Sequence, residues 1–226
     1  MVLRYSRARD AAIYTLPMFG KSLFAKVPFA QSWNIAPGTV QPVIYCGGPT
    51  SARWGFVPVF AGTRRPMLTS CRLDDKNSET WKTMCRIARL IVPADGWYEW
   101  LATDGVEQPY FIKPKDGGPV FLAALSSFSF DEEAQATDGF VMVSSSTDVG
   151  IVNSRSHRPV VLNAFDAVRW LHPKTTFGLA KKIAADSIMP RQMFRSFQVS
   201  VGVNSVRNDE PAFNDPLPDG IVMSLK

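Results

Sequence analysis

The sequence predicts an α+β fold, in which a single compact, β-rich domain over residues 1–226 carries a few flanking helices. Hydrophobic residues make up 46% of the 226 positions and aromatic residues 12%, which is enough for a full core. Short apolar runs interrupted by Gly or Pro outnumber the segments with helical spacing. No repeat, low-complexity linker or shift in composition divides the chain, so one domain is the simplest interpretation.

The clearest predicted strands lie on either side of a turn at Asp95-Gly96. Residues 90–92 are branched and apolar, as in a buried strand, and Pro93 is expected to end that strand. Gly96 suits a tight reversal, and the WYEW run at residues 97–100 resumes a strand pattern. Further strands or extended segments are expected at residues 33–37, 42–45, 52–59, 110–112, 120–125, 140–144 and 198–203.

Helical spacing is found in only a few segments. Residues 78–89 repeat apolar side chains at three- and four-residue steps, with Ser78 as the expected N-cap. A second helix is expected at residues 163–171, and residues 178–185 are a candidate for a third. Residues 12–29 contain short apolar pieces without a clear period.

Composition excludes several classes of protein. No run of about 18 apolar residues is present, which argues against a membrane-spanning helix. The N-terminal residues lack the apolar stretch and cleavage site of a signal peptide. Three cysteines without CxxC spacing and two histidines support neither a disulfide framework nor a zinc site. We therefore expect a cytoplasmic protein that binds no membrane and needs no metal ion or cofactor.

Positive charge is concentrated in one part of the sequence. The chain has a formal net charge of +5, and residues 53–89 contain eight Lys or Arg against three Asp or Glu. Several aromatic residues lie among these charges. Phosphates attract cations and unstacked bases attract flat rings, so the mixture suits nucleic acid. A scattered basic surface that serves only solubility is the alternative.

Glu99 is the most informative single acid, because it lies between Tyr98 and Trp100. A carboxylate surrounded by aromatic rings is desolvated, which raises its pKa toward the range useful for proton transfer. The alternative is a strand glutamate that faces solvent or pairs with an arginine.

Several motifs in order resemble one family. They are WNIAP at 33–37, ARWGFVP at 52–58, PADGWYEW at 93–100, RPVVL at 158–162, RWLHP at 169–173 and VSVGVNSVRNDEP at 199–211. Together with Arg4 they resemble the SRAP (SOS-response-associated peptidase) family of abasic-site processing proteins over nearly the whole chain.

The resemblance implies a β-rich fold with a positively charged face for single-stranded DNA. In this family the second residue is a cysteine, which becomes the N-terminus when Met is removed. Its α-amine condenses with the sugar aldehyde of an abasic site, and its thiol closes a thiazolidine that crosslinks protein and DNA. A Glu, an Asn and a His assist this step, and the Glu and His are also implicated in peptidase (hydrolase) activity.

Carried over residue by residue, only one chemical position matches the family. Val2 replaces the cysteine, Ser70 replaces the asparagine, and Arg155 stands at the position of the histidine, whereas Glu99 is retained. His157, two residues further on, is either a replacement for that histidine or a residue facing solvent or phosphate. The family's thiazolidine cannot form without the thiol, although an α-amine at Val2 still allows a reversible imine.

The positions that would hold DNA are better preserved. Arg4 and Arg72 match family positions, and a guanidinium suits bidentate phosphate contact. Trp54 either stacks on an exposed base or belongs to the core. Asn34 either shapes the rim of the site or serves a turn.

Three functional hypotheses follow from these residues. The first is a divergent SRAP-type protein that binds single-stranded or junction DNA, with crosslinking of abasic sites weak or lost. The second is a purely non-catalytic binder of single-stranded nucleic acid. The third is a hydrolase using Cys71 or a Ser70–His157 pair, which a buried Cys71 would exclude. The oligomeric state is left open.

Overall fold

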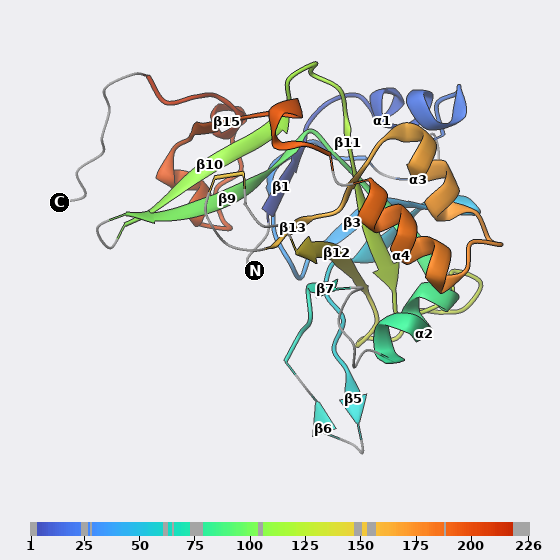
Figure 1. Ribbon diagram of the computed structural model, residues 1–226. Helices are drawn as coiled ribbons and strands as arrows, with labels where there is room; N and C mark the ends of the chain where they lie inside the picture. The colour runs from blue at the N-terminus through green and yellow to red at the C-terminus, as the bar shows by residue number, and fades with distance from the viewer. Residues whose placement is uncertain are drawn as a thin grey trace.

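Two sheets pack face to face, and helices cover the outer side of one of them (Figure 1). The structure is a computed structural model that describes residues 4–23, 27, 29–60, 63–64, 66–72, 79–103, 106–146, 151–152, 157–187 and 189–218. This arrangement confirms the predicted α+β, β-rich class. The exact extent of the domain, residues 1–226, stays a prediction.

The first sheet is antiparallel and has the strand order β15-β10-β9-β1-β2. Its strands are β15 (Phe194–Gln198), β10 (Val106–Pro114), β9 (Gly96–Thr103), β1 (Arg4–Arg7) and β2 (Ser32–Ile35). The WYEW run pairs with β10 on one side and with the N-terminal strand β1 on the other. The tight reversal predicted at Asp95-Gly96 is therefore wrong, because residues 90–92 belong to the second sheet and do not pair with residues 97–100.

The second sheet has the order β13-β12-β11-β8-β3-β4, with β14 added to β11 and β7 added to β12 in parallel. Its strands are β13 (His157–Pro159), β12 (Phe140–Ser146), β11 (Val120–Ser126), β8 (Ala88–Ala94), β3 (Val40–Tyr45), β4 (Gly48–Arg53), β14 (Val161–Leu162) and β7 (Ser70–Arg72). A separate small ribbon pairs β5 (Val59–Phe60) with β6 (Thr63–Arg64).

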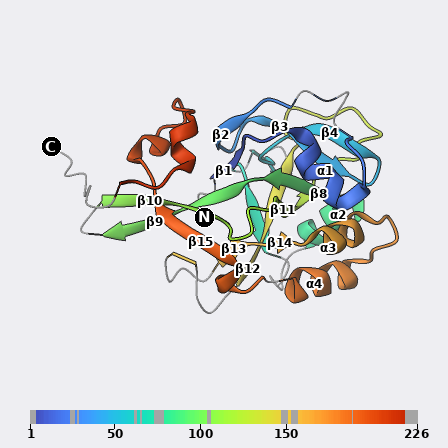
Figure 2. The ribbon, with the colours of Figure 1, turned by 90° about the horizontal axis from the view of Figure 1, so that it is seen from above.

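The helices gather on the side of the second sheet that faces away from the first (Figure 2). They are α1 (Ala11–Phe19), α2 (Glu79–Ile87), α3 (Ala164–Leu171) and α4 (Phe177–Asp186). Three 3-10 turns, η2 (Arg191–Met193), η3 (Val201–Asn204) and η4 (Pro211–Asn214), flank β15 or follow it.

The core forms in layers, which explains the apolar run in β8. Leu90 and Val92 belong to the cluster between the two sheets, whereas Ile91 packs under the helices. Both faces of β8 are buried, so every residue of the run is apolar. A third cluster, centred on Tyr98 and Phe111, lies on the outer face of the first sheet beneath η3 and η4.

Three predicted strand limits are wrong. The strand expected at residues 52–59 is not continuous, because β4 ends at Arg53 and β5 begins only at Val59. Pro93 does not end its strand, because β8 continues to Ala94 with Pro93 opposite Phe121. The strand expected at residues 198–203 is instead the end of β15 followed by η3. Val199 lies between β15 and η3 and Val203 lies within η3, and both cover the outer-face cluster.

The segment without a clear period forms α1, so the sequence pattern missed a helix. Its ends are defined by capping rather than by amphipathicity: the Asp10 side chain accepts a hydrogen bond from the Ala12 backbone N–H, and Gly20 ends the helix with φ of 67°. The helices expected near residues 78–89, 163–171 and 178–185 are confirmed as α2, α3 and α4, although Ser78 lies outside the described residues.

Candidate functional site

Glu99 lies in the middle of β9, on the face of the first sheet that packs against the second. Side chains alternate along a strand, so Trp97 and Glu99 share this inner face while Tyr98 and Trp100 point to the outer face. The register with β10 places Tyr110 directly opposite Glu99. The WYEW run thus divides its residues between two surfaces.

The Glu99 carboxylate is largely enclosed and receives two N–H donors. Trp97 Nε1 donates to Oε1 at 3.1 Å, and the backbone N–H of Val152 donates to Oε2 at 3.2 Å. Burial raises the pKa of Glu99, while these two hydrogen bonds and the charges of Arg158 and Arg191 lower it less strongly. The expected desolvation is confirmed, and a carboxyl in this state is suited to holding or moving a proton.

Arg158 is the residue that sequence reasoning missed. It lies in β13 opposite Ser145, its side chain is only 7% exposed, and Nη2 donates to the Met189 carbonyl at 2.7 Å. Burial lowers the pKa of Arg158 and the negative charge of Glu99 opposes that shift. In the sequence this residue is only the first of the RPVVL motif, and no motif pointed to a cation beside Glu99.

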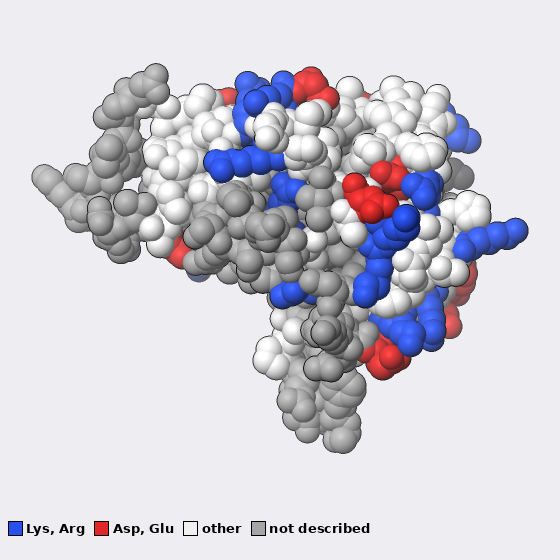
Figure 3. All heavy atoms as spheres, viewed as in Figure 1, with Lys and Arg blue, Asp and Glu red and all other residues white. Residues whose placement is uncertain are grey.

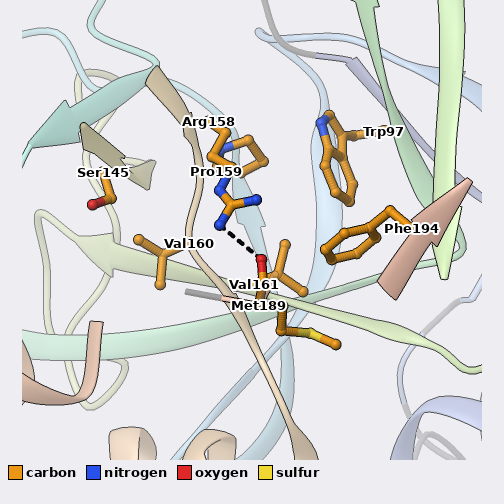
Figure 4. A pocket seen from close by; sticks show the side chains of 8 residues that line it. All are labelled: Trp97, Ser145, Arg158, Pro159, Val160, Val161, Met189 and Phe194. Atoms are coloured by element: carbon orange, nitrogen blue, oxygen red, sulfur yellow. Dashed lines mark hydrogen bonds between the residues drawn. The ribbon is translucent and has the colours of Figure 1, made fainter. Parts of the chain in front are cut away.

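A small cavity adjoins this pair (Figure 4). Figure 4 shows the Arg158 guanidinium directed toward Met189, with the Trp97 and Phe194 rings on the neighbouring wall. Those two rings meet edge to face with centroids 5.1 Å apart. The volume is about 10 Å³, which is about the space for one water molecule. Arg158 lines this cavity and Glu99 does not, but the charge of Arg158 acts on the pKa of the enclosed Glu99 carboxylate.

A hydrolase that uses Cys71 as its nucleophile is excluded. Cys71 is 4% exposed, and burial raises the pKa of its thiol, so it is neither accessible nor ionised.

The Ser70–His157 pair is excluded as well. Ser70 pairs with Met142 and His157 with Ser146, and both pairings use β12. β7 and β13 lie on opposite edges of β12. The Met142 backbone N–H donates to Thr69 O, just before β7, whereas the Val143 carbonyl accepts from the Val160 N–H, just after β13. The separation is about 10 Å across the sheet and about 13 Å along it, too far for a catalytic hydrogen bond.

Arg4 and Asn34 lie on the outer face and anchor the C-terminal segment. The Arg4 guanidinium donates to Asn34 Oδ1 at 3.1 Å, to Asn204 O at 2.9 Å and to Val203 O. Asn34 Nδ2 donates to the carbonyls of residues 203, 205 and 208 at 2.8–3.1 Å. Both side chains are buried and have a structural role, and their expected contacts with DNA stay predictions.

Trp54 is a core residue, the second of its two alternatives. Its ring is fully buried, lies 6.3 Å from Phe140 and 5.5 Å from Tyr5, and donates from Nε1 to Thr69 O at 2.9 Å. A base cannot stack on a ring without an exposed face, so the stacking alternative is wrong. Arg72 ends β7 opposite Ser144 and is partly exposed.

The remaining candidate positions are not described. Val2 and Arg155 lie outside the described residues, and of His157 only the backbone in β13 is described.

The basic segment does not form one continuous face in the described part of the chain. Arg89 is buried and donates to the carbonyls of Cys85, Trp170 and His172. Arg53 binds loop carbonyls, including Asp138 O at 3.2 Å. Figure 3 shows Lys and Arg near η2 and again over α2 and α4, with acidic residues between them. Two of the eight cations are therefore structural.

None of the helices in the described part of the chain is both long and apolar enough to cross a membrane. The described residues also contain no cluster of three or more His, Cys, Asp or Glu side chains able to hold a metal ion.

Comparison with known proteins identifies the family. The family model described as "SOS response associated peptidase (SRAP)" matches residues 1–206. The chain belongs to the SRAP family. It is 30% identical over 199 residues to the "Abasic site processing protein YedK" of Escherichia coli, covering 82% of this chain and 84% of the relative.

Other relatives agree with this assignment. The "Abasic site processing protein HMCES" of Gallus gallus is 29% identical over 203 residues, which span 77% of this chain and 59% of that protein. A crystal structure of a phage-related protein from Bordetella bronchiseptica superposes with a TM-score of 0.74 at 27% identity, covering 96% and 99% of the two chains. The SRAP fold is therefore shared along nearly the whole chain.

Proposed function

We propose that this SRAP protein binds DNA that contains an abasic site, in single-stranded or junction form, and that covalent capture of the site is weak or lost. The proposal rests on the state of Glu99, the one chemical position of the family that this chain retains. Glu99 is enclosed on the inner face near the Arg158 guanidinium, while position 2 is valine. The names of the relatives, which describe abasic site processing, support the choice of ligand. The site residues and a cytoplasmic location remain part of the proposal.

The residual chemistry follows from the groups that remain. An abasic sugar presents an aldehyde. Once Met1 is removed, the unprotonated α-amine of Val2 can add to it and lose water to give an imine. Glu99, with its raised pKa, is suited to deliver the proton that leaves with that water. No thiol is present at position 2 to trap the imine, so the adduct stays reversible.

A denaturing gel tests this proposal. The protein is incubated with single-stranded DNA containing an abasic site, with and without borohydride, beside a Val2→Cys variant whose loss of Met1 is confirmed by mass spectrometry. We expect a band for the unchanged chain only with borohydride, and a stable band for the variant. A stable adduct of the unchanged chain without reductant would contradict weak or lost capture.

A second candidate function is purely non-catalytic binding of single-stranded nucleic acid. It is favoured by the two N–H donors on Glu99, which fix both carboxylate oxygens within the fold. The absence of any band in both chains, combined with salt-sensitive binding to a gapped oligonucleotide, would support this alternative. Arg72→Ala should then weaken binding to all sequences alike, because phosphate contacts carry no base information.

A further inference from the structure

A larger hollow lies on the outer face of the first sheet, away from Glu99. It encloses about 340 Å³, a volume typical of small-molecule sites. Its lining includes Trp33, Phe111, Lys113 and Arg195. Lys113 is two residues from Phe111 along β10, so its side chain is on the same outer face. It lies three residues, or about 10 Å along the strand, from Tyr110, which is paired with Glu99.

Two cations lie side by side in the lining of this hollow. Lys113 and Arg195 are directly opposite in the β10–β15 register. Like charges in that arrangement destabilise a sheet. Neither residue forms an ion pair in the described part of the chain. Burial, followed by the charge of Arg195, lowers the pKa of Lys113. An anion placed between the two side chains would relieve this repulsion.

The nearest acid in the lining is already neutralised. Asp95 accepts hydrogen bonds from Arg9 Nε at 2.5 Å, Tyr14 Oη at 2.7 Å and the Ala8 backbone N–H at 2.7 Å. The remaining Arg9 donors bind the carbonyls of Gly117 and Gly118. Arg9 and Asp95 therefore form a fixed pair of no net charge. The other acid whose field reaches Lys113 is the exposed Asp215.

We propose that this hollow is a second binding site, which takes the phosphate group of a nucleotide. Lys113 and Arg195 would donate to the phosphate oxygens, since charge-assisted bonds from these groups suit phosphate. The partly buried Trp33 supplies a ring against which the attached base can pack. A free mononucleotide and the terminal phosphate of a strand share this chemistry. The site does not depend on the function proposed for Glu99, because it occupies the opposite face.

Isothermal titration of the full chain with dAMP tests the proposal. We expect dAMP to bind and deoxyadenosine, which lacks the phosphate, to bind about tenfold more weakly or worse. Lys113→Gln combined with Arg195→Gln should weaken dAMP binding about tenfold, whereas Asp215→Asn should tighten it. The matched control, Lys174→Gln with Lys182→Gln, removes two exposed cations elsewhere and should leave the affinity unchanged.

Folding of the variant is checked by its melting temperature, which should not fall because a repulsive pair is removed. Three results would overturn the proposal: no heat from dAMP up to about 5 mM, equal binding of deoxyadenosine, or equal losses in the test and control variants. A 5′-phosphorylated oligonucleotide that binds more tightly than dAMP assigns the site to a strand end. Equal or weaker binding assigns it to a free nucleotide. Loss of abasic-site capture with dAMP binding intact would affect only the earlier proposal.

Discussion

The two faces of the first sheet use the same strand, β9, in different ways. On the inner face, Trp97 donates to the enclosed carboxylate of Glu99, whose pKa is also influenced by the charge of Arg158. On the outer face, Tyr98 Oη donates to Trp33 O at 2.6 Å and Trp100 Nε1 to Asn204 Oδ1 at 2.7 Å. Alternate residues of WYEW thus serve a titratable site and an anchor for the C-terminal segment.

The difference shows how one short motif specifies both chemistry and architecture. The inner face isolates a carboxylate from water, which changes its proton affinity. The outer face satisfies Arg4 with carbonyls and an amide, so its charge is used for positioning. If this division is right, substitutions on the inner face should change core stability and proton affinity, and those on the outer face should release the C-terminal segment.

Trp97→Ala should have the largest effect, because it empties a fully buried site between the sheets. We expect the free energy of unfolding to fall by about 3–5 kcal/mol. Trp100→Ala on the outer face, where the ring is partly exposed, should cost about 1 kcal/mol. Urea unfolding of both variants measures the difference. Equal losses of stability in the two variants would contradict the difference between the inner and the outer face.

Arg4→Met should cause the second-largest loss in the free energy of unfolding. The change keeps the apolar stem but removes the donor of Asn34 Oδ1 and Asn204 O, whereas Val203 O keeps its hydrogen bond from Asn34 Nδ2. A loss of about 2–3 kcal/mol is expected from charge-assisted hydrogen bonds in a buried setting. Limited proteolysis should also cut sooner within residues 203–218. Arg207→Ala, at an exposed position of the same segment, is the control and should leave both measurements unchanged.

Sequence patterns predicted the fold where burial is regular. The apolar run of β8 and the spacing of α3 are direct consequences of buried faces, and both were located from the sequence. The sequence patterns failed where helix capping, or a segment that packs over a cluster, determines the local structure. Asp10 and Gly20 define α1 without an apolar stripe. Val199 and Val203 cover the outer-face cluster from a loop and a 3-10 turn.

The site was only partly predictable for a similar reason. Two aromatic neighbours in the sequence singled out Glu99, but their rings point to the outer face, and the ring that contacts Glu99 is Trp97, two residues away. Arg158 becomes its neighbour through β13, 59 positions later, and no local pattern encodes that approach. The burial of Trp54 likewise depends on Tyr5 and Phe140, which lie far from it in the chain.

The third prediction concerns pH. The pKa of Glu99 is raised in the folded state, so the native chain binds more protons than the unfolded chain above the ordinary glutamate pKa of about 4.3. Its contribution to stability is therefore complete below that pH and decreases as pH rises through the folded pKa. Glu99→Gln should remove this decrease, so the variant gains stability relative to the unchanged chain between pH 4 and pH 8. Urea midpoints across that range measure the slope; identical slopes would mean that Glu99 is not desolvated.

The smallest effect is expected for Tyr110→Phe, directly across from Glu99 on the inner face. The hydroxyl accepts a hydrogen bond from Gln198 Nε2 at 3.0 Å in an exposed position, and Glu99 has its donors elsewhere. Because water replaces an exposed partner, the free energy of unfolding should change by about 0.5 kcal/mol or less. The pH slope assigned to Glu99 should also stay unchanged, because the variant keeps the ring that covers this face. A changed slope would show that the tyrosine hydroxyl belongs to the Glu99 site, and the inner face would then extend across β10.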